Sequence, residues 1–245
     1  MHQNLNGDTL QEQLSELLRK HCQTSKAPLC HDKDFLPISE IEWIVSIETV
    51  RQVLAEELPG LSEEKREQLS KDICGDRPRR RVFALLLLGE QTKCIQCFVN
   101  CDVDDTDLPF VGVKAESNLW IYSRKDTTKK LQCFDAWRRK DLEWLLSRQH
   151  VVAPPFFDLS PGQLLLYDLP EDSVLPFTEY EMLGEGGYAT VFKVLIHPAH
   201  HNCPGQGVSG PMTVRCFRTG NNRMTGTRNP VLRHQNAQQS KQSRV

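Results

Sequence analysis

Apolar residues recur every three or four positions through most of the first 150 residues, and this period favours one class of fold above the others. The spacing places the apolar side chains on one face of an α-helix. Local signals mark where such helices begin and end: N-caps at Asp8 or Thr9, a capping box of Ser39 with Glu42, a cap at Ser62, a stop at Leu58-Pro59-Gly60, and Gly75 just past a helix end. The sequence therefore predicts a mainly helical region over residues 1–150.

The expected helices span residues 9–22, 39–58, 62–74, 82–91, 92–100 and 136–149, with a loop over 24–37. The segment VFALLLLGEQ at 82–91 is apolar on most sides, so it fits either a buried helix or a buried strand. It has no β-branched residues after Val82, which favours the helix. Residues 108–134 stay ambiguous, with a strand expected at 119–122.

The composition indicates the cellular compartment of this protein. The longest apolar run, Val82–Leu88, is seven residues long, whereas a membrane helix needs about 20. The first residues, MHQNLNGDTLQEQL, have neither the basic segment nor the apolar segment of a secretory signal. The nine cysteines are an odd number without a disulfide framework, which favours reduced thiols. We therefore expect an intracellular protein, cytoplasmic or nuclear, without a transmembrane segment.

The charge is unevenly distributed along the chain. Residues 203–245 carry seven Lys or Arg and no Asp or Glu, which leaves 23 basic and 32 acidic residues in the first 202. This basic tail shows no apolar period, so we expect it to be disordered. Its charges lack interleaved aromatic residues, so a solvated end is favoured over nucleic-acid binding.

Three groups of metal-ligating residues are each better explained without a metal. Cys94, Cys97 and Cys101 have no second pair to complete four zinc ligands, and their spacing indicates a stripe on the core face of a helix. The acidic turn Asp102–Asp107 lacks the glycine and the glutamate of a calcium loop, so a solvated turn is expected. The histidine-rich loop His197–Cys203 is expected to have no specific role. We predict no metal site.

The strongest functional pattern is FTEYEMLGEGGYATVFKV at residues 177–194. Gly184, Gly186 and Ala189 occupy the small positions of G-x-G-x-x-[GA], and Thr190–Ile196 reads as a strand instead of the helix of a dinucleotide-binding fold. Two strands joined by such a turn can present backbone N–H groups to phosphate oxygens without intervening Cβ atoms. The alternative is an ordinary glycine-rich hairpin.

Residues 183–194 resemble the opening of a serine/threonine protein kinase domain. The wider sequence, from DLPF at 107–110 through VVAPPFF to LPFTEYEMLGEGGYATVFKVLIHPAHH, resembles kinase-domain proteins of filamentous fungi with a helical N-terminal region, over about residues 35–202. The resemblance implies ATP as ligand, with Leu183 and Val191 covering the adenine and the backbone of 185–188 over the phosphates. The implied nucleotide-binding residues are Leu183, Gly184, Glu185, Gly186, Gly187, Tyr188, Ala189 and Val191.

The departures from the kinase pattern set the expected activity. Lys193 is not at the position of the lysine that pairs with the phosphates, and no V-A-x-K follows it. Arg215 in MTVRCF lies in a weakly strand-like context. The planar guanidinium of an arginine does not replace the point charge of a lysine. The sequence has no H-R-D-x-x-x-x-N to supply a base and no D-F-G to hold Mg²⁺. We therefore expect a truncated kinase-like protein that keeps the ATP-phosphate loop but is inactive. The alternative is a non-enzymatic helical module that binds protein partners.

These expectations combine into an α+β arrangement. A helical region covers residues 1–150 and a linker covers 151–176. A β-hairpin resembling the start of a kinase small lobe covers 177–202, and the disordered basic tail covers 203–245.

Overall fold

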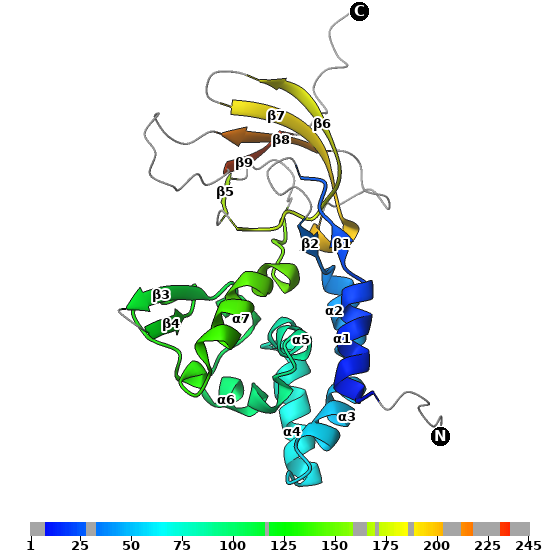
Figure 1. Ribbon diagram of the computed structural model, residues 1–245. Helices are drawn as coiled ribbons and strands as arrows, with labels where there is room; N and C mark the ends of the chain where they lie inside the picture. Colours follow the sequence, from blue (N-terminus) through cyan, green and yellow to red (C-terminus); the bar gives the residue numbers. More distant parts are fainter. Residues whose placement is uncertain are drawn as a thin grey trace, which may run out of the picture. The chain divides into compact units, whose positions relative to one another are not determined.

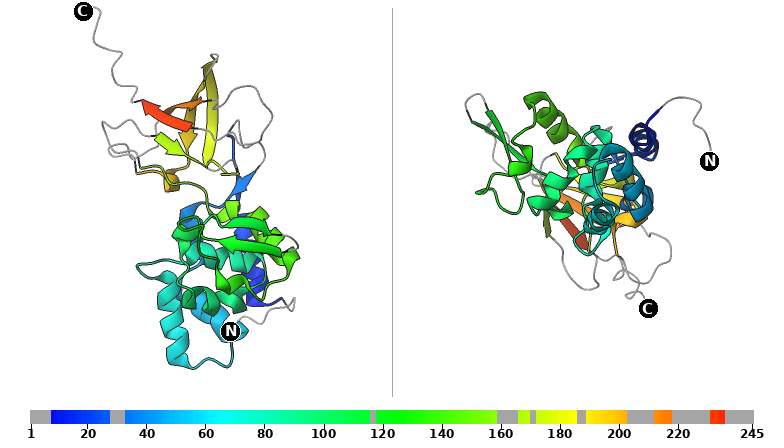
Figure 2. Two further views of the ribbon diagram at one scale, coloured as in Figure 1. Left: turned by 90° about the vertical axis from the view of Figure 1, so that its left-hand side faces the viewer. Right: turned by 90° about the horizontal axis from the view of Figure 1, so that it is seen from below.

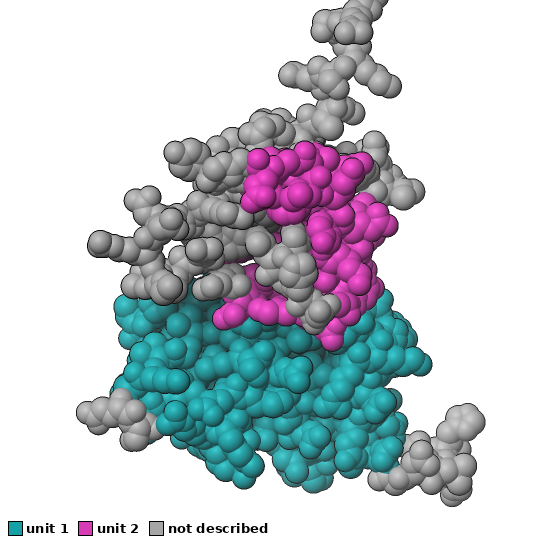
Figure 3. Space-filling view, turned by 45° about the horizontal axis from the view of Figure 1, so that its top comes forward, with its two compact units in different colours: residues 1–22, 36–153 teal, residues 23–35, 154–245 magenta. Residues whose placement is uncertain are grey.

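The computed structural model describes residues 8–27, 33–115, 118–158, 166–169, 172–185, 189–202, 212–217 and 231–235. The chain divides into two compact units (Figure 3). Each unit has a hydrophobic core of its own. Unit 1 comprises residues 1–22 and 36–153, and unit 2 comprises 23–35 and 154–245. The fold combines α-helices with small antiparallel sheets, as the sequence predicts. Within the described ranges, no helix has the length and apolar character needed to cross a membrane.

Unit 1 is built mainly from helices (Figure 1). They are α1 (Leu10–Lys20), α2 (Ile38–Ile44), α3 (Ile47–Glu57), α4 (Glu63–Cys74), α5 (Arg80–Leu88), α6 (Ile95–Asn100) and α7 (Arg139–Val152). Short 3-10 turns lie at η1 (Thr92–Cys94), η2 (Asp105–Asp107) and η3 (Gln132–Phe134), and strands β3 (Val111–Ala115) and β4 (Asn118–Tyr122) form an antiparallel hairpin.

Helix α5 forms the centre of the unit 1 core. All seven residues of Val82–Leu88 are buried, and α5 contacts α1, α2, α4 and α7. A helix that is apolar all round is stable only where other elements cover every side. The helix interpretation of this segment is confirmed, because it is surrounded by other helices instead of being paired in a sheet.

Two of the expected caps are confirmed and one is wrong. Thr9 caps α1 in a capping box with Glu12, and the Ser62 side chain accepts the Lys65 N–H at the start of α4. The expected helix over 39–58 is instead two helices, because Val45 leaves helical geometry and the Ser46 side chain caps α3. Helix α2 begins after Pro37 without a side-chain cap, so the Ser39 capping box is not formed.

Unit 2 contains a five-stranded antiparallel sheet with the strand order β5-β9-β8-β7-β6 (Figure 2). Its strands are β5 (Leu166–Asp168), β6 (Phe177–Glu185), β7 (Ala189–Ile196), β8 (Met212–Phe217) and β9 (Val231–Gln235). The unit also holds the small pair β1 (Gln23–Thr24) and β2 (Asp34–Phe35) and the turn η4 (Pro198–His200). Strand β6 lies at one edge of the sheet.

The sheet corrects the expectation for residues 203–245. Strand β8 pairs with β7, and β9 pairs with β8, so these two segments of the basic tail have regular structure. Pairing to a strand distant in sequence satisfies backbone groups, and the composition of the segment does not reveal it. The expectation of disorder is wrong for 212–217 and 231–235, while the rest of the tail lies outside the described residues.

The core of unit 2 draws on segments expected to be a linker and a polar loop. Phe157, Leu169 and Leu175, within 151–176, are buried with Phe177. The turn η4 buries His200 completely, and its ring lies edge-on to Phe35 with centroids 5.8 Å apart. His200 Nδ1 lies 3.1 Å from the carbonyl oxygen of Pro155. The histidine loop therefore has a packing role that its polar sequence did not indicate.

Candidate functional site

The glycine-rich segment lies between strands β6 and β7, as the sequence predicts for a strand–loop–strand arrangement. The strands are antiparallel, and Glu185 on β6 pairs with Thr190 on β7 next to the loop. Gly186, Gly187 and Tyr188 lie outside the described residues, and for Ala189 only the backbone is described. The described part of the predicted nucleotide site is therefore its two flanking strands.

Leu183 adjoins the Gly184–Val191 pair of this hairpin. Gly184 pairs with Val191, and a shift of register between Met182 and Gly184 places Leu183 beside that pair. Leu183 is 52% exposed, and among the described residues no atom beyond the chain neighbours lies within 4 Å of the position that a Cβ on Gly184 would take. On strand β6 an exposed apolar side chain is thus followed directly by a residue without a Cβ.

Strand β8 brings a cationic residue into register with the hairpin. Arg215 is the partner of Val191 across the β7–β8 ladder, one strand further from the β6 edge. Within the hairpin itself, Lys193 on β7 pairs with Glu181 on β6, with 3.4 Å between Nζ and Oε2. Both of these side chains are substantially exposed, so this ion pair contributes little to stability.

A second candidate site lies in unit 1, in the turn after α6 that the sequence reading treats as a solvated acidic turn. That expectation holds for Asp102, which is 69% exposed, and is wrong for Asp104 and Asp107, which are only 5% and 7% exposed. Asp104 accepts hydrogen bonds from Arg77 (2.8 Å to Nη2) and Lys125 (2.9 Å to Nζ). Asp107 accepts from the Ser123 hydroxyl. Cations distant in the sequence therefore compensate the buried carboxylates.

Local chemistry explains how this turn forms. The Asp104 carboxylate accepts the backbone N–H and the hydroxyl of Thr106, and the Asp107 carboxylate accepts the backbone N–H of Asp104 at 2.7 Å. A D-x-T triplet favours this kind of turn, because the aspartate side chain bonds to the backbone two residues on. Asp126 and Thr128 repeat the arrangement on the surface. The two D-x-T triplets were a signal in the sequence that could have located this region.

The ionisation of the turn follows from these contacts. Burial by itself would raise the pKa of the Asp104 carboxyl, but hydrogen bonds from Thr106, Lys125 and Arg77 outweigh it and hold the pKa well below its usual range. The hydrogen bonds that Arg77 donates to Asp104 and Asp102 raise the pKa of its guanidinium. Asp105 differs, because burial raises the pKa of its carboxyl to about 6 although it accepts the Val82 N–H at the start of α5.

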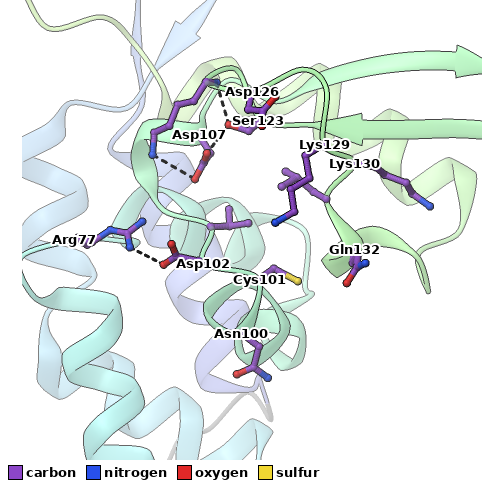
Figure 4. Close-up of a pocket in the computed structure, with 13 residues that line it drawn as sticks. Arg77, Asn100, Cys101, Asp102, Asp107, Ser123, Asp126, Lys129, Lys130 and Gln132 are labelled. Carbon is purple, nitrogen blue, oxygen red and sulfur yellow. Dashed lines mark hydrogen bonds and ion pairs between the residues drawn. The ribbon is translucent and has the colours of Figure 1, made fainter.

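A hollow of about 460 Å³ lies beside this turn (Figure 4). Its walls come from the end of α6 and the residues that follow it, from the segment after β4, and from Arg77 in the connection between α4 and α5. The lining residues are Arg77, Asn100, Cys101, Asp102, Val103, Asp107, Ser123, Lys125, Asp126, Lys129, Lys130, Leu131 and Gln132. Apart from Val103, Leu131 and the Cys101 thiol, these side chains are polar or charged.

The cysteine stripe is confirmed only in part. Cys94 and Cys101 pack against the core of unit 1, whereas Cys97 is exposed. Cys133, which the sequence pattern did not include, is buried and lies against Cys101. Burial raises the pKa values of the Cys97 and Cys133 thiols. Among the described residues, no group of three His, Cys, Asp or Glu side chains has the geometry to hold a metal ion.

Comparison with known proteins adds no relative to this description: no family model matches the chain, and no curated protein or solved structure gives a match.

Proposed function

We propose that the β6–β7 hairpin binds the phosphates of ATP weakly, and that this chain does not transfer the phosphoryl group. The observation that carries the proposal is Gly184 on strand β6, a residue without a Cβ that pairs with Val191 and has no described atom beyond its chain neighbours within 4 Å of a Cβ position. An anion can approach the backbone closely only where no Cβ intervenes. Leu183, exposed beside Gly184, offers the apolar surface that an adenine ring would cover.

Arg215 on β8 supports phosphate binding more than it supports catalysis. Its backbone pairs with that of Val191, so the sequence has an arginine on the strand next to the hairpin. A guanidinium binds phosphate oxygens well, but as a planar fork it does not reproduce the point charge of the kinase lysine. The printed sequence supplies neither an H-R-D-x-x-x-x-N base nor a D-F-G metal ligand. Positioning and charge stabilisation by those groups account for most of phosphoryl-transfer catalysis.

ATP titration of the full chain tests this function, followed by calorimetry or by a fluorescent ATP analogue. We expect weak, saturable binding that Gly184→Asp abolishes, because the new carboxylate adds a Cβ and a negative charge where the phosphates approach. Gly60→Asp is the matched control, since Gly60 also has no described atom beyond its chain neighbours within 4 Å of its Cβ position but lies in unit 1. No saturable binding to the unmodified chain would exclude the nucleotide function.

An assay of phosphoryl transfer completes the test. We expect the pure chain to transfer no labelled phosphate from ATP to a generic protein substrate. ATP-dependent labelling that disappears in the Gly184→Asp/Gly186→Asp variant would show that the chain is an active enzyme.

The alternative function, protein interaction through the helical unit, rests on Trp43. This side chain on α2 is 61% exposed, and its ring is tilted against the His21 ring with centroids 5.4 Å apart. Exposed tryptophans are enriched among the residues that dominate binding energy at protein interfaces. A chain that shows no ATP binding in the titration above would favour this alternative.

A further inference from the structure

The acidic groups at the hollow in unit 1 already accept hydrogen bonds. Two exposed carboxylates line it, of which Asp102 accepts from Arg77 and Asp126 accepts from Thr128. The two buried aspartates of the adjoining turn have more donors. Asp104 takes bonds from Arg77, Lys125 and Thr106, and Asp107 takes bonds from Ser123 and from the Asp104 backbone. Buried carboxylates with this many donors have little remaining capacity to accept further hydrogen bonds. The acidic groups therefore act as fixed supports for the cations around the hollow.

The cations keep donor capacity. The Arg77 guanidinium has five N–H groups and the Lys125 ammonium three, and their bonds to Asp102 and Asp104 hold them at the wall of the hollow. Arg77 is 55% exposed and Lys125 is 46% exposed, so both remain accessible from the solvent side. A ligand that accepts hydrogen bonds would find these donors already positioned.

Lys129 is a further cation of this hollow, and it lies near the lining residue Asp126. The pKa of the Asp126 carboxyl is lowered mainly by hydrogen bonds from Thr128, and the backbone N–H and the charge of Lys129 add to that effect. Figure 4 shows the Lys129 side chain extending toward the middle of the hollow, while Lys130 points away, where its ammonium contacts Asp135 and lies 4.8 Å from the centre of the Trp120 ring. In the described part of the chain, Lys129 makes no ion pair within 4.0 Å. Asn100 and Gln132 add amide groups to the same wall.

We propose that this hollow binds a compact, polar organic anion through a phosphate or a carboxylate group. Its volume of about 460 Å³ lies within the usual range for small-molecule sites, roughly 300–1,000 Å³. Lys129, Arg77 and Lys125 contact the anionic group, and the amides of Asn100 and Gln132 bind hydroxyl or carbonyl groups of the remainder. The site is independent of the nucleotide function proposed for the hairpin, because every lining residue belongs to unit 1.

Backbone amide NMR of the full chain tests the site with three probes: glycerol 3-phosphate, malate and uncharged glycerol. We expect saturable shifts of residues 100–103 and 123–132 with at least one of the two anions and none with glycerol. Stronger binding of glycerol 3-phosphate identifies phosphate as the preferred group, and stronger binding of malate identifies carboxylate.

Lys129→Ala is the decisive variant, because its side chain is exposed and supports no ion pair in the described chain. Loss of one charged hydrogen bond should weaken binding about tenfold or more. Lys140→Ala, which removes an exposed lysine of α7 outside the hollow, should leave the affinity unchanged. The proposal is overturned if neither anion saturates at millimolar concentration, if Lys129→Ala binds as well as the unmodified chain, or if the shifts lie in residues 183–191 instead.

Discussion

Replacement of Asp104 by asparagine removes one negative charge from the centre of the buried turn while keeping the shape of the side chain. The amide oxygen can still accept from Thr106, but the amide N–H₂ group then faces the N–H groups of Arg77. Arg77 and Lys125 both lose their buried anionic partner at this position. We expect the variant to fold with the same helices and to be less stable.

The size of the loss follows from the exposure of each partner. A buried hydrogen bond to a charged group contributes about 1.5–3 kcal/mol, and the Thr106 bonds keep part of that value in the variant. The bonds from the half-exposed Arg77 and Lys125 contribute about 0.2–1 kcal/mol each after solvent screening. We therefore expect a decrease of about 2–3 kcal/mol in the free energy of unfolding of unit 1. For a chain of this size the decrease corresponds to a lower melting temperature by about 5–10 °C.

Tryptophan fluorescence during thermal unfolding measures this loss selectively. The chain has four tryptophans, at positions 43, 120, 137 and 144, and all of them belong to unit 1. Asp126→Asn is the matched control, because Asp126 bonds to Thr128 as Asp104 bonds to Thr106, but on the exposed surface. Equal melting temperatures for the Asp104 and Asp126 variants would refute the reasoning.

The pH dependence gives a second check on the same variant. The folded-state pKa of Asp104 is depressed below its ordinary value of 3.8, so its carboxylate contributes stability that is present above that pH and is lost as the pH falls toward the folded-state pKa. The difference in stability between the unmodified chain and Asp104→Asn should therefore shrink below pH 3.8. A difference that stays constant through acid would mean that charge plays no part in the loss.

Two further substitutions test the packing of unit 1. Burial raises the pKa of Asp105 to about 6 from 3.8. The stability that its protonated carboxyl contributes is therefore complete below pH 3.8 and is lost as the pH rises through about 6. Asp105→Asn should remove this pH dependence of the free energy of unfolding, measured with urea, and an unchanged pH dependence would contradict the assignment. A Cβ on Gly89 would lie 2.6 Å from a Trp144 ring atom, so Gly89→Ala should destabilise unit 1 by about 1–3 kcal/mol. Gly60→Ala is its control, because the new Cβ has no described atom beyond the chain neighbours within 4 Å. Equal stability of the two glycine variants would show that the Trp144 contact is unimportant.

Features set by neighbouring residues were predictable from the sequence. The caps at Thr9 and Ser62 were found because a hydroxyl side chain bonds to backbone N–H groups only three residues away. The helix at 82–91 and the strand following the glycine-rich segment also follow from local composition and period. The break before α3 was missed because the apolar period continues across it, while Ser46 makes a better local cap than Ser39.

The tertiary structure alone decided the features that depend on distant partners. Whether Asp104 is solvated or buried depends on Arg77, 27 positions before it, and on Lys125, 21 positions after it. Whether Arg215 belongs to a disordered tail or to a strand depends on the hydrogen-bonded ladder between β8 and β7. Period and composition record what a segment offers to its neighbours in sequence. They contain no information about which remote charge or strand edge satisfies a buried group, and for this chain that choice determines both candidate sites.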